Sequence, residues 1–155
     1  EIENKFMLRA INLSIESVNN NGGPFGCVIV KNNKIIAEGY NKVTSSNDPT
    51  AHGEIVAIRN ACNNLKTFNL SGTKLYSSCE PCPMCLSAIY WSHIDKVFFG
   101  NTRNDASKIG FDDNFIYEEF SKDLSSRKIP LIQILEIKAK KAFSLWEQKS
   151  DKIKY

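Results

Sequence analysis

Side chains that bind metals or carry protons occur in two short segments that are widely separated in the sequence. His52 and Glu54 lie in the first segment, and Cys82 and Cys85 lie in the second. Residues two apart in a helix interior point about 200° apart, so His52 and Glu54 can face one centre only from the first turn of a helix. Cys82 and Cys85 are three apart and share a face at a helix start, where Pro83 is tolerated. The pattern therefore predicts a fold in which two helices begin at one metal site.

The order of the expected elements indicates an α/β fold. Strands are expected at 25–31, 34–40, 74–78, 94–100 and 131–137, and helices at 3–18, from His52 onward, and at 83–92, 115–124 and 138–149. Asn32 and Asn33 suit a tight hairpin turn, and Asp48 or Thr50 is available to cap the helix near His52. A hairpin pairs antiparallel strands, whereas a strand, helix, strand connection favours parallel ones, so the sheet should be mixed and flanked by helices. Residues 101–114 form the least regular stretch, and a long loop in a compact domain is more often functional than idle.

Length and composition exclude several classes of protein. The chain has 155 residues, 42% hydrophobic and 24% charged, as expected for a single globular domain. Its apolar runs are far shorter than the roughly 18 residues of a membrane helix, and its first residues lack a secretory pattern. Five cysteines favour metal binding in a reducing compartment, with Cys27 and Cys62 as packing residues. We therefore expect a cytoplasmic protein without a membrane partner. The net charge is only +3, and the basic residues are spread along the chain, so a nucleic-acid partner is not required.

The number of ligands separates a catalytic zinc site from a structural one. A structural zinc is closed by four protein ligands, whereas a catalytic zinc has three and leaves the fourth position to water or substrate. His52, Cys82 and Cys85 make three, and Glu54 remains as a proton carrier. Zinc lowers the pKa of its water toward neutrality, which makes hydroxide available as a nucleophile. These residues predict hydrolytic removal of an amino group from an electron-poor ring carbon, with Glu54 moving the protons.

Two other interpretations of the C-x-x-C pair explain less. A zinc ribbon would use Cys82 and Cys85 as half of a structural site, but there is no second C-x-x-C, and a ribbon needs no carboxylate beside a ligand. A thiol-redox motif also occurs at helix starts, but it leaves His52 and Glu54 without a role. Cys79 lies three residues before Cys82 and is interpreted as a supporting residue, not a ligand.

Three segments of the chain resemble the cytidine deaminase-like superfamily, in the branch that holds guanine deaminases and tRNA adenosine deaminases. They are Gly23–Gly26 (GPFG), Ser46–Glu54 (SNDPTAHGE) and Ser78–Cys85 (SCEPCPMC). Residues 106–118 and the tail that ends in Tyr155 are similar to bacterial guanine deaminases in particular. The resemblance implies a three-layer α/β/α cytidine deaminase-like fold with a central five-stranded mixed sheet. It also implies hydrolysis of guanine to xanthine and ammonia, in purine catabolism or salvage.

The resemblance also implies the cofactor and the assembly. One zinc ion per active site is expected, with the family's ligands falling on His52, Cys82 and Cys85 and its proton shuttle on Glu54. The residues 1–155 should form a single deaminase domain and a homodimer in which the C-terminal segment, about residues 138–155, is exchanged between partners. The one visible departure is a glycine between His52 and Glu54, where the family usually has alanine.

Contacts to the base are implied at Asn41 and Asp113, with Phe25 and Tyr155 lining or closing the pocket. Guanine presents N1–H and amino donors that a carboxylate such as Asp113 can accept, which places Asp113 beside Glu54 in the catalytic set. Asn41 offers both a donor and an acceptor to a purine edge. Structural alternatives exist: Asp113 is also able to cap the next helix, Asn41 to close a strand end, and Tyr155 to belong to a frayed terminus.

The same zinc centre serves other substrates in related enzymes. A tRNA adenosine deaminase acts on a flipped base and needs a basic, base-stacking surface at an open pocket, whereas residues 110–117 and the tail favour a closed pocket. Guanosine, cytosine or another amino-heterocycle is a nearer alternative to guanine as the substrate. A zinc-binding module without catalytic activity is a further alternative, but the presence of Glu54 argues against it. The prediction is therefore a zinc-dependent hydrolase of a cyclic amidine C–N bond, with a small purine base and water as its substrates.

Overall fold

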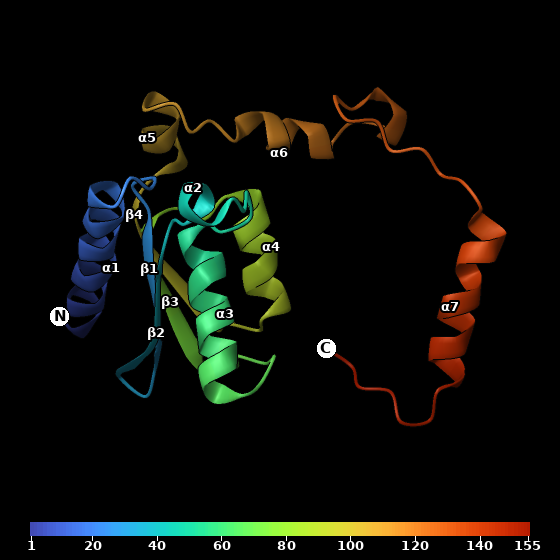
Figure 1. Cartoon of the computed structure of the whole chain (residues 1–155), viewed down its shortest axis with the longest axis horizontal. Coiled ribbons are helices and arrows are strands. Elements are labelled where there is room, and N and C mark those ends of the chain that lie inside the picture. The colour runs from blue at the N-terminus through green and yellow to red at the C-terminus, as the bar shows by residue number, and fades with distance from the viewer. The chain divides into compact units, whose positions relative to one another are not determined.

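The computed structural model describes residues 1–155 and divides into two compact units, Glu1–Asp113 (unit 1) and Asn114–Tyr155 (unit 2). Unit 1 contains α1 (Ile2–Asn19), β1 (Gly26–Lys31), β2 (Lys34–Tyr40), α2 (Val43–Ser46), α3 (Gly53–Leu65), β3 (Thr73–Cys79), α4 (Pro83–Trp91), β4 (Lys96–Asn101) and α5 (Arg103–Lys108) (Figure 1). Unit 2 contains α6 (Asn114–Phe120), the 3₁₀ helix η1 (Leu124–Ser126) and α7 (Glu136–Gln148).

A mixed four-stranded sheet forms the centre of unit 1. Its strand order is β2-β1-β3-β4, in which β1 is antiparallel to both β2 and β3, and β3 is parallel to β4. The β1–β2 hairpin turns at Asn32 and Asn33, whose φ angles are 50° and 58°, the left-handed conformation that asparagine tolerates. The hairpin and the parallel crossover agree with the sequence expectation of a mixed sheet.

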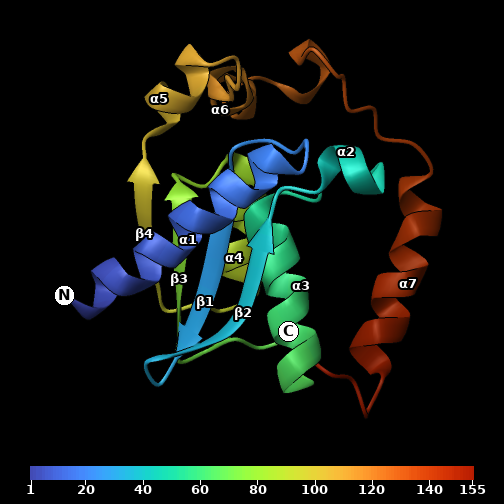
Figure 2. The ribbon, with the colours of Figure 1, turned by 60° about the vertical axis from the view of Figure 1, so that its left-hand side comes forward.

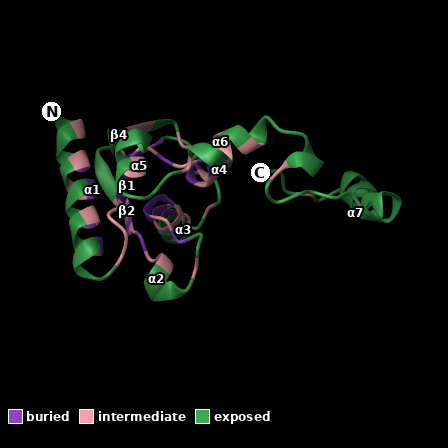
Figure 3. Ribbon diagram, turned by 90° about the horizontal axis from the view of Figure 1, so that it is seen from above, coloured by how far each residue is buried: buried purple, intermediate pink, exposed green.

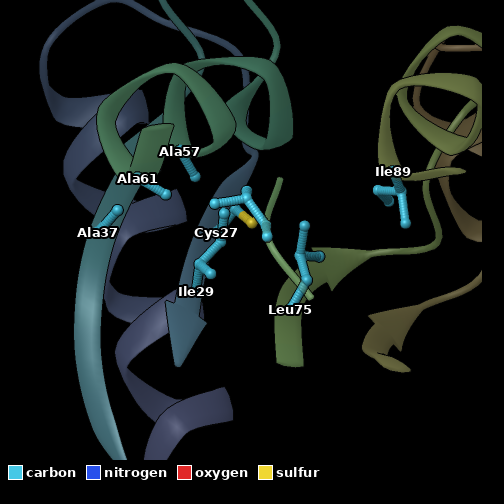
Figure 4. Packing of buried hydrophobic residues seen from close by; sticks show 8 residues of the cluster. Cys27, Ile29, Ala37, Ala57, Ala61, Leu75 and Ile89 are labelled. Atoms are coloured by element: carbon cyan, nitrogen blue, oxygen red, sulfur yellow. The ribbon is translucent and has the colours of Figure 1, made fainter. Parts of the chain in front are cut away.

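Helices cover both faces of this sheet (Figure 2). On one face α1 buries Phe6, Ala10 and Leu13 against Val28 and Tyr76 of the sheet. The other face packs against α3 and α4 through a cluster of small and aliphatic side chains, namely Cys27, Ile29, Ala37, Ala57, Ala61, Leu70, Leu75 and Ile89 (Figure 4). Because successive strand residues point to opposite faces, neighbouring residues such as Cys27 and Val28 belong to different clusters. Cys27 is fully buried and Cys62 packs at the margin, as predicted.

The fifth strand expected at Leu131–Ile137 is absent, and the sheet of this chain has four strands instead of five. Residues 131–135 have no ladder partner, and α7 already begins at Glu136. A β-prone run becomes a strand only when its backbone groups meet those of another strand, which composition alone cannot guarantee. All buried residues, shown in purple in Figure 3, belong to unit 1, and unit 2 has none.

The stretch after β4 is more regular than expected, because residues 103–108 form α5. The helix begins with a capping box in which the Thr102 hydroxyl accepts from the Asp105 amide, and the Asp105 carboxylate accepts from the Thr102 amide. Gly110 follows with a φ of 98°, a conformation that favours glycine. The helix expected at 115–124 is α6 and ends at Phe120.

No helix of the structure combines the length and the apolar character that crossing a membrane requires. This agrees with the short apolar runs of the sequence.

Candidate active site

The metal-ligand residues lie at the N-termini of α3 and α4. His52 is the N-cap of α3 and Cys82 is the N-cap of α4, both with extended backbone and without a side-chain cap hydrogen bond. Their side chains are thereby left to turn toward each other. Cys85 follows in the first turn of α4, which begins with Pro83 as predicted. The expectation that Asp48 or Thr50 caps α3 is wrong, because the N-cap position belongs to His52.

Asp48 and Thr50 instead stiffen the loop that leads to His52. The Asp48 carboxylate accepts hydrogen bonds from the Thr50 amide at 2.9 Å and from the Thr50 hydroxyl at 2.7 Å. The Arg59 guanidinium, on α3, donates to the second Asp48 oxygen at 3.2 Å. These bonds lower the pKa of Asp48, the Thr50 hydroxyl having the largest effect. The loop is thus tied to the helix whose first turn carries the site.

The three ligand atoms are spaced as a zinc ion requires. The His52 Nδ1 atom lies 3.5 Å from the Cys82 Sγ atom and 3.5 Å from the Cys85 Sγ atom. A tetrahedral zinc with Zn–S of about 2.3 Å and Zn–N of about 2.0 Å places its sulfur and nitrogen ligands about 3.5 Å apart. All three ligand atoms lie within 4.8 Å of one another, and no other histidine, cysteine or acidic residue joins the group. The residues therefore fit a three-ligand zinc site.

The electrostatic environment favours a thiolate in the site. Hydrogen bonds from Cys85 and His52 lower the pKa of Cys82 to about 4, against the opposing effect of burial. The hydrogen bond with Cys82 raises the pKa of His52. Both helix N-termini add positive potential, which also stabilises a thiolate. Cys85 is fully buried, and its bond to the Cys82 sulfur, together with burial, raises its pKa.

Glu54 lies beside the ligands but is not one of them. It is the second residue of α3 and only 6% exposed. Burial raises the pKa of its carboxyl group, and hydrogen bonds that include one from the Ser77 hydroxyl partly oppose this effect. The Ser77 Oγ atom donates to Glu54 Oε1 at 2.8 Å. A buried carboxyl group with a raised pKa, next to a metal site, is suited to accept and return protons.

Cys79 is a neighbour of the site and not a ligand, in agreement with the sequence interpretation. Its thiol lies at the end of β3 and donates to the carbonyl of Thr102 at 3.8 Å. Burial and the negative charge of Glu54 raise its pKa to about 11. Cys79 therefore stays a neutral thiol at physiological pH.

Asn41 and Phe25 lie together at the same end of the sheet. The backbone N–H of Asn41 donates to the Phe25 carbonyl at 3.0 Å, and the Asn41 side chain is largely buried. The side-chain Oδ1 atom of Asn41 accepts from the Val43 backbone N–H at 3.2 Å. Asn41 therefore does close the end of β2, which was the structural alternative for this residue. Because this bond engages only the side-chain oxygen, the side-chain NH2 group keeps its donors for a ligand. The ring of Phe25 meets the ring of Phe111 edge to face at a centroid distance of 4.9 Å.

Asp113 belongs to the same neighbourhood. Burial raises the pKa of its carboxyl group, and the negative charge of Cys82 raises it further, while Arg103 lowers it. The structure thus brings Asp113 within electrostatic range of a zinc ligand. Tyr155 belongs to unit 2, and its place at the pocket stays a prediction.

Sequence reasoning missed two residues, Ser77 and Phe111. Ser77 is a serine at a buried position of a central strand, next to a second serine, and such polar residues among apolar ones are the signal that was available. Phe111 lies in a stretch that was predicted as a functional loop without a role for this ring. An aromatic residue after a glycine in such a loop was the corresponding signal.

Comparison with known proteins places these residues in a family. A model of the cytidine and deoxycytidylate deaminase zinc-binding region matches residues 1–101, which include the three ligands and Glu54. The chain is 50% identical to guanine deaminase from Bacillus subtilis over 151 residues, 97% of each protein. The X-ray structure of B. subtilis guanine deaminase superposes with a TM-score of 0.95 at 49% identity, over 98% of both chains. A tRNA-specific adenosine deaminase from Buchnera aphidicola is 44% identical over 88 residues, 57% of this chain and 58% of that protein.

Proposed function

Because the chain belongs to the cytidine and deoxycytidylate deaminase family, we propose that it catalyses the zinc-dependent hydrolysis of guanine to xanthine and ammonia. The observation that carries the choice of guanine is the similarity to a guanine deaminase over 97% of the chain. The tRNA adenosine deaminase resembles only 57% of it. The family fold and the three-ligand site carry the reaction class.

Each site residue has a chemical task in this reaction. His52, Cys82 and Cys85 hold the zinc, which when bound lowers the pKa of a water so that hydroxide is available near neutral pH. Glu54 accepts a proton from the attacking water and delivers it to the ring nitrogen next to the amino-bearing carbon. It then takes the proton of the added hydroxyl group and passes it to the amino group, so that the carbonyl forms as the C–N bond breaks and ammonia leaves. Guanine and water thus give xanthine and ammonia.

The pocket residues complement the edges of guanine. Asp113 accepts from the N1–H and amino donors, and its raised pKa fits a carboxylate whose charge gains from a donor of this kind. The amide donors of Asn41 suit the O6 and N7 acceptors of the base. Phe25, held against Phe111, supplies an aromatic wall for a planar ring. We propose these three side chains as the substrate contacts.

A panel of substrates tests the proposed function. We expect ammonia release from guanine to exceed release from guanosine, adenine and cytosine, with none from an anticodon stem-loop, because the closed pocket that we propose would exclude a sugar and a folded RNA. Coupled detection of ammonia at equal concentrations of each compound is the measurement. Turnover of the stem-loop without turnover of guanine would show that the substrate assignment is wrong, while the zinc chemistry would stand.

We also propose that the active enzyme is a homodimer that exchanges its C-terminal segment, about residues 138–155. The helix α7 buries no residue, and it exposes large apolar side chains: Ile137 is 86% exposed and Phe143 is 79% exposed. Apolar surface of this extent needs a covering partner. The five free cysteines further support a reducing compartment, and we propose a cytoplasmic location.

An unpaired sheet edge offers a place for the partner's segment. The strand β4 pairs only with β3, so its outer edge has open backbone donors and acceptors. Residues 131–135 read Leu-Ile-Gln-Ile-Leu, and Ile132 and Ile134 are 80% and 75% exposed. We propose that this run from a second copy adds a fifth strand to β4, and that the tail ending in Tyr155 then closes the partner's pocket.

Deletion of Ile153–Tyr155 is expected to lower kcat/KM for guanine while the domain stays folded. Ile153 and Tyr155 are 66% and 74% exposed, so little stability is lost, but under the proposed exchange the partner's pocket is left open to water. Co-expression with a Glu54→Gln chain of full length provides the decisive comparison. Each variant alone should be weakly active, whereas mixed dimers should recover activity, because the inactive chain donates its tail to an intact site. If the activity of the co-expressed mixture stays as low as that of each variant alone, the C-terminal segment is not exchanged.

A further inference from the structure

The hydroxyl of Ser77, on β3, reaches the carboxylate of Glu54. Its Oγ atom donates to the Glu54 Oε1 atom at 2.8 Å, and Ser77 is only 1% exposed. In the sheet Ser77 lies between Cys27 of β1 and Phe99 of β4. It therefore approaches the carboxylate from the floor of the site, on the face that packs against α3.

The apolar surroundings make a hydroxyl at this position costly unless it is bonded. Leu75 lies two residues earlier on the same face and is part of the core, and Cys27 beside Ser77 is fully buried. A buried hydroxyl without a partner is destabilising, so a bond must offset its burial. The bond that offsets the burial of Ser77 is the bond to Glu54. The adjacent Ser78 points to the opposite face, and its hydroxyl accepts from the Gly26 amide of β1 at 3.0 Å.

The bond to Ser77 restricts the orientation of the Glu54 carboxylate. The terminal torsion of glutamate has a broad, roughly two-fold energy profile, so a free carboxylate turns easily. A donor fixed in a central strand holds one oxygen and leaves the other in a defined direction. Proton transfer depends steeply on such geometry, because the carboxylate must lie within hydrogen-bond reach of each proton that it moves.

We propose that Ser77 is a positioning residue for deamination: its hydroxyl holds Oε1 of Glu54 and so fixes the orientation of the carboxylate for the proton transfers. The proposal rests on the proposed role of Glu54 as the proton shuttle. It assigns to Ser77 a role in kcat that a merely structural serine in β3 would not have.

Replacement of Ser77 by alanine tests the proposal, with Thr73→Val as a matched control. Thr73 is a fully buried residue of β3 whose hydroxyl bonds to the Leu70 carbonyl at 2.6 Å, away from the site. Ser77→Ala should lower kcat roughly 10- to 100-fold, the range expected when a hydrogen bond to a charged group is lost, with KM and bound zinc little changed. Thr73→Val also loses one buried hydroxyl but should keep the parent kcat. A parent-like kcat in Ser77→Ala overturns the proposal.

A second pair of variants separates the hydroxyl from the volume of the side chain. Threonine and valine at position 77 have nearly the same size, and only threonine can donate to Glu54. We expect kcat of Ser77→Thr to exceed that of Ser77→Val by about tenfold or more. Equal values for the two variants would refute the positioning role, and this comparison stands even if Ser77→Ala folds poorly.

A double-mutant cycle provides a readout that does not depend on activity. If Ser77 and Glu54 form one interacting pair, the effects of Ser77→Ala and Glu54→Ala on the free energy of unfolding should not add, whereas those of Thr73→Val and Glu54→Ala should add. Additive effects in the first pair contradict the bond. Failure of the two proposals is also distinguishable: an active Glu54→Gln variant removes the shuttle, while an inactive one combined with a parent-like Ser77→Ala removes only the role of Ser77.

Discussion

Glu54→Gln is expected to lower kcat for guanine roughly 10²- to 10⁴-fold, the usual contribution of a positioned general acid and base. Glutamine has nearly the same shape but cannot accept the proton of the attacking water at neutral pH, so both the attack and the departure of ammonia lose their proton carrier. The side chain is buried and is not a ligand, and the change should therefore leave zinc content intact. Stopped assays of xanthine formation, together with zinc analysis of the same sample, measure the two effects.

The control for Glu54→Gln is Asn60→Ala on the solvent side of the same helix. The Asn60 side chain donates to the Glu38 carbonyl at 2.8 Å and is exposed, so its loss should change stability slightly and kcat not at all. A Glu54→Gln enzyme with full zinc and a rate near the parent value would show that another group moves the protons. Loss of zinc from this variant would instead show that Glu54 supports the ligands.

The metal site was predictable because its geometry is local. His52 and Cys82 are both helix N-caps, and the spacing of two and three residues to Glu54 and Cys85 decides which side chains can converge in a first turn. The helix starts follow from short-range signals, such as Pro83 after Cys82. Only the meeting of the two helix starts is a tertiary fact, and the ligand chemistry implied it.

Other features depended on contacts that local patterns do not encode. Residues 131–135 have the composition of a strand, but whether they form one depends on which backbone edge they meet, and that edge need not belong to the same chain. The role of Ser77 arises from a contact between β3 and α3, 23 residues apart in the sequence. The helix α5 has only six residues, and its capping pair Thr102 and Asp105 was the sole signal. Boundaries and pairings were therefore less predictable than the site.

Cys85→Ala should remove zinc and activity together. The two remaining ligands, His52 and Cys82, bind the ion weakly. Loss of a residue that only supports a ligand lowers metal affinity by up to about 100-fold, so we expect loss of a ligand itself to lower zinc affinity by more than about 100-fold. Cys62→Ala is the matched control, because Cys62 lies at the margin of the core and outside the ligand group. Competition with a chromogenic chelator measures the affinity, and zinc per chain should stay at the parent value in the control.

The thermal stability of the same variants tests whether zinc also holds the two helix starts together. A ligand that binds only the folded state stabilises it by RT ln(1 + [L]/Kd), so a chelator should lower Tm of the parent and of Cys62→Ala, but should not change Tm of Cys85→Ala. Zinc must displace the proton of Cys85, whose pKa is raised by the Cys82 sulfur and by burial. Zinc affinity should consequently rise with pH, and the chelator should remove the ion more easily as pH falls. Chelator-sensitive Tm in Cys85→Ala would mean that another side chain replaces the lost thiolate.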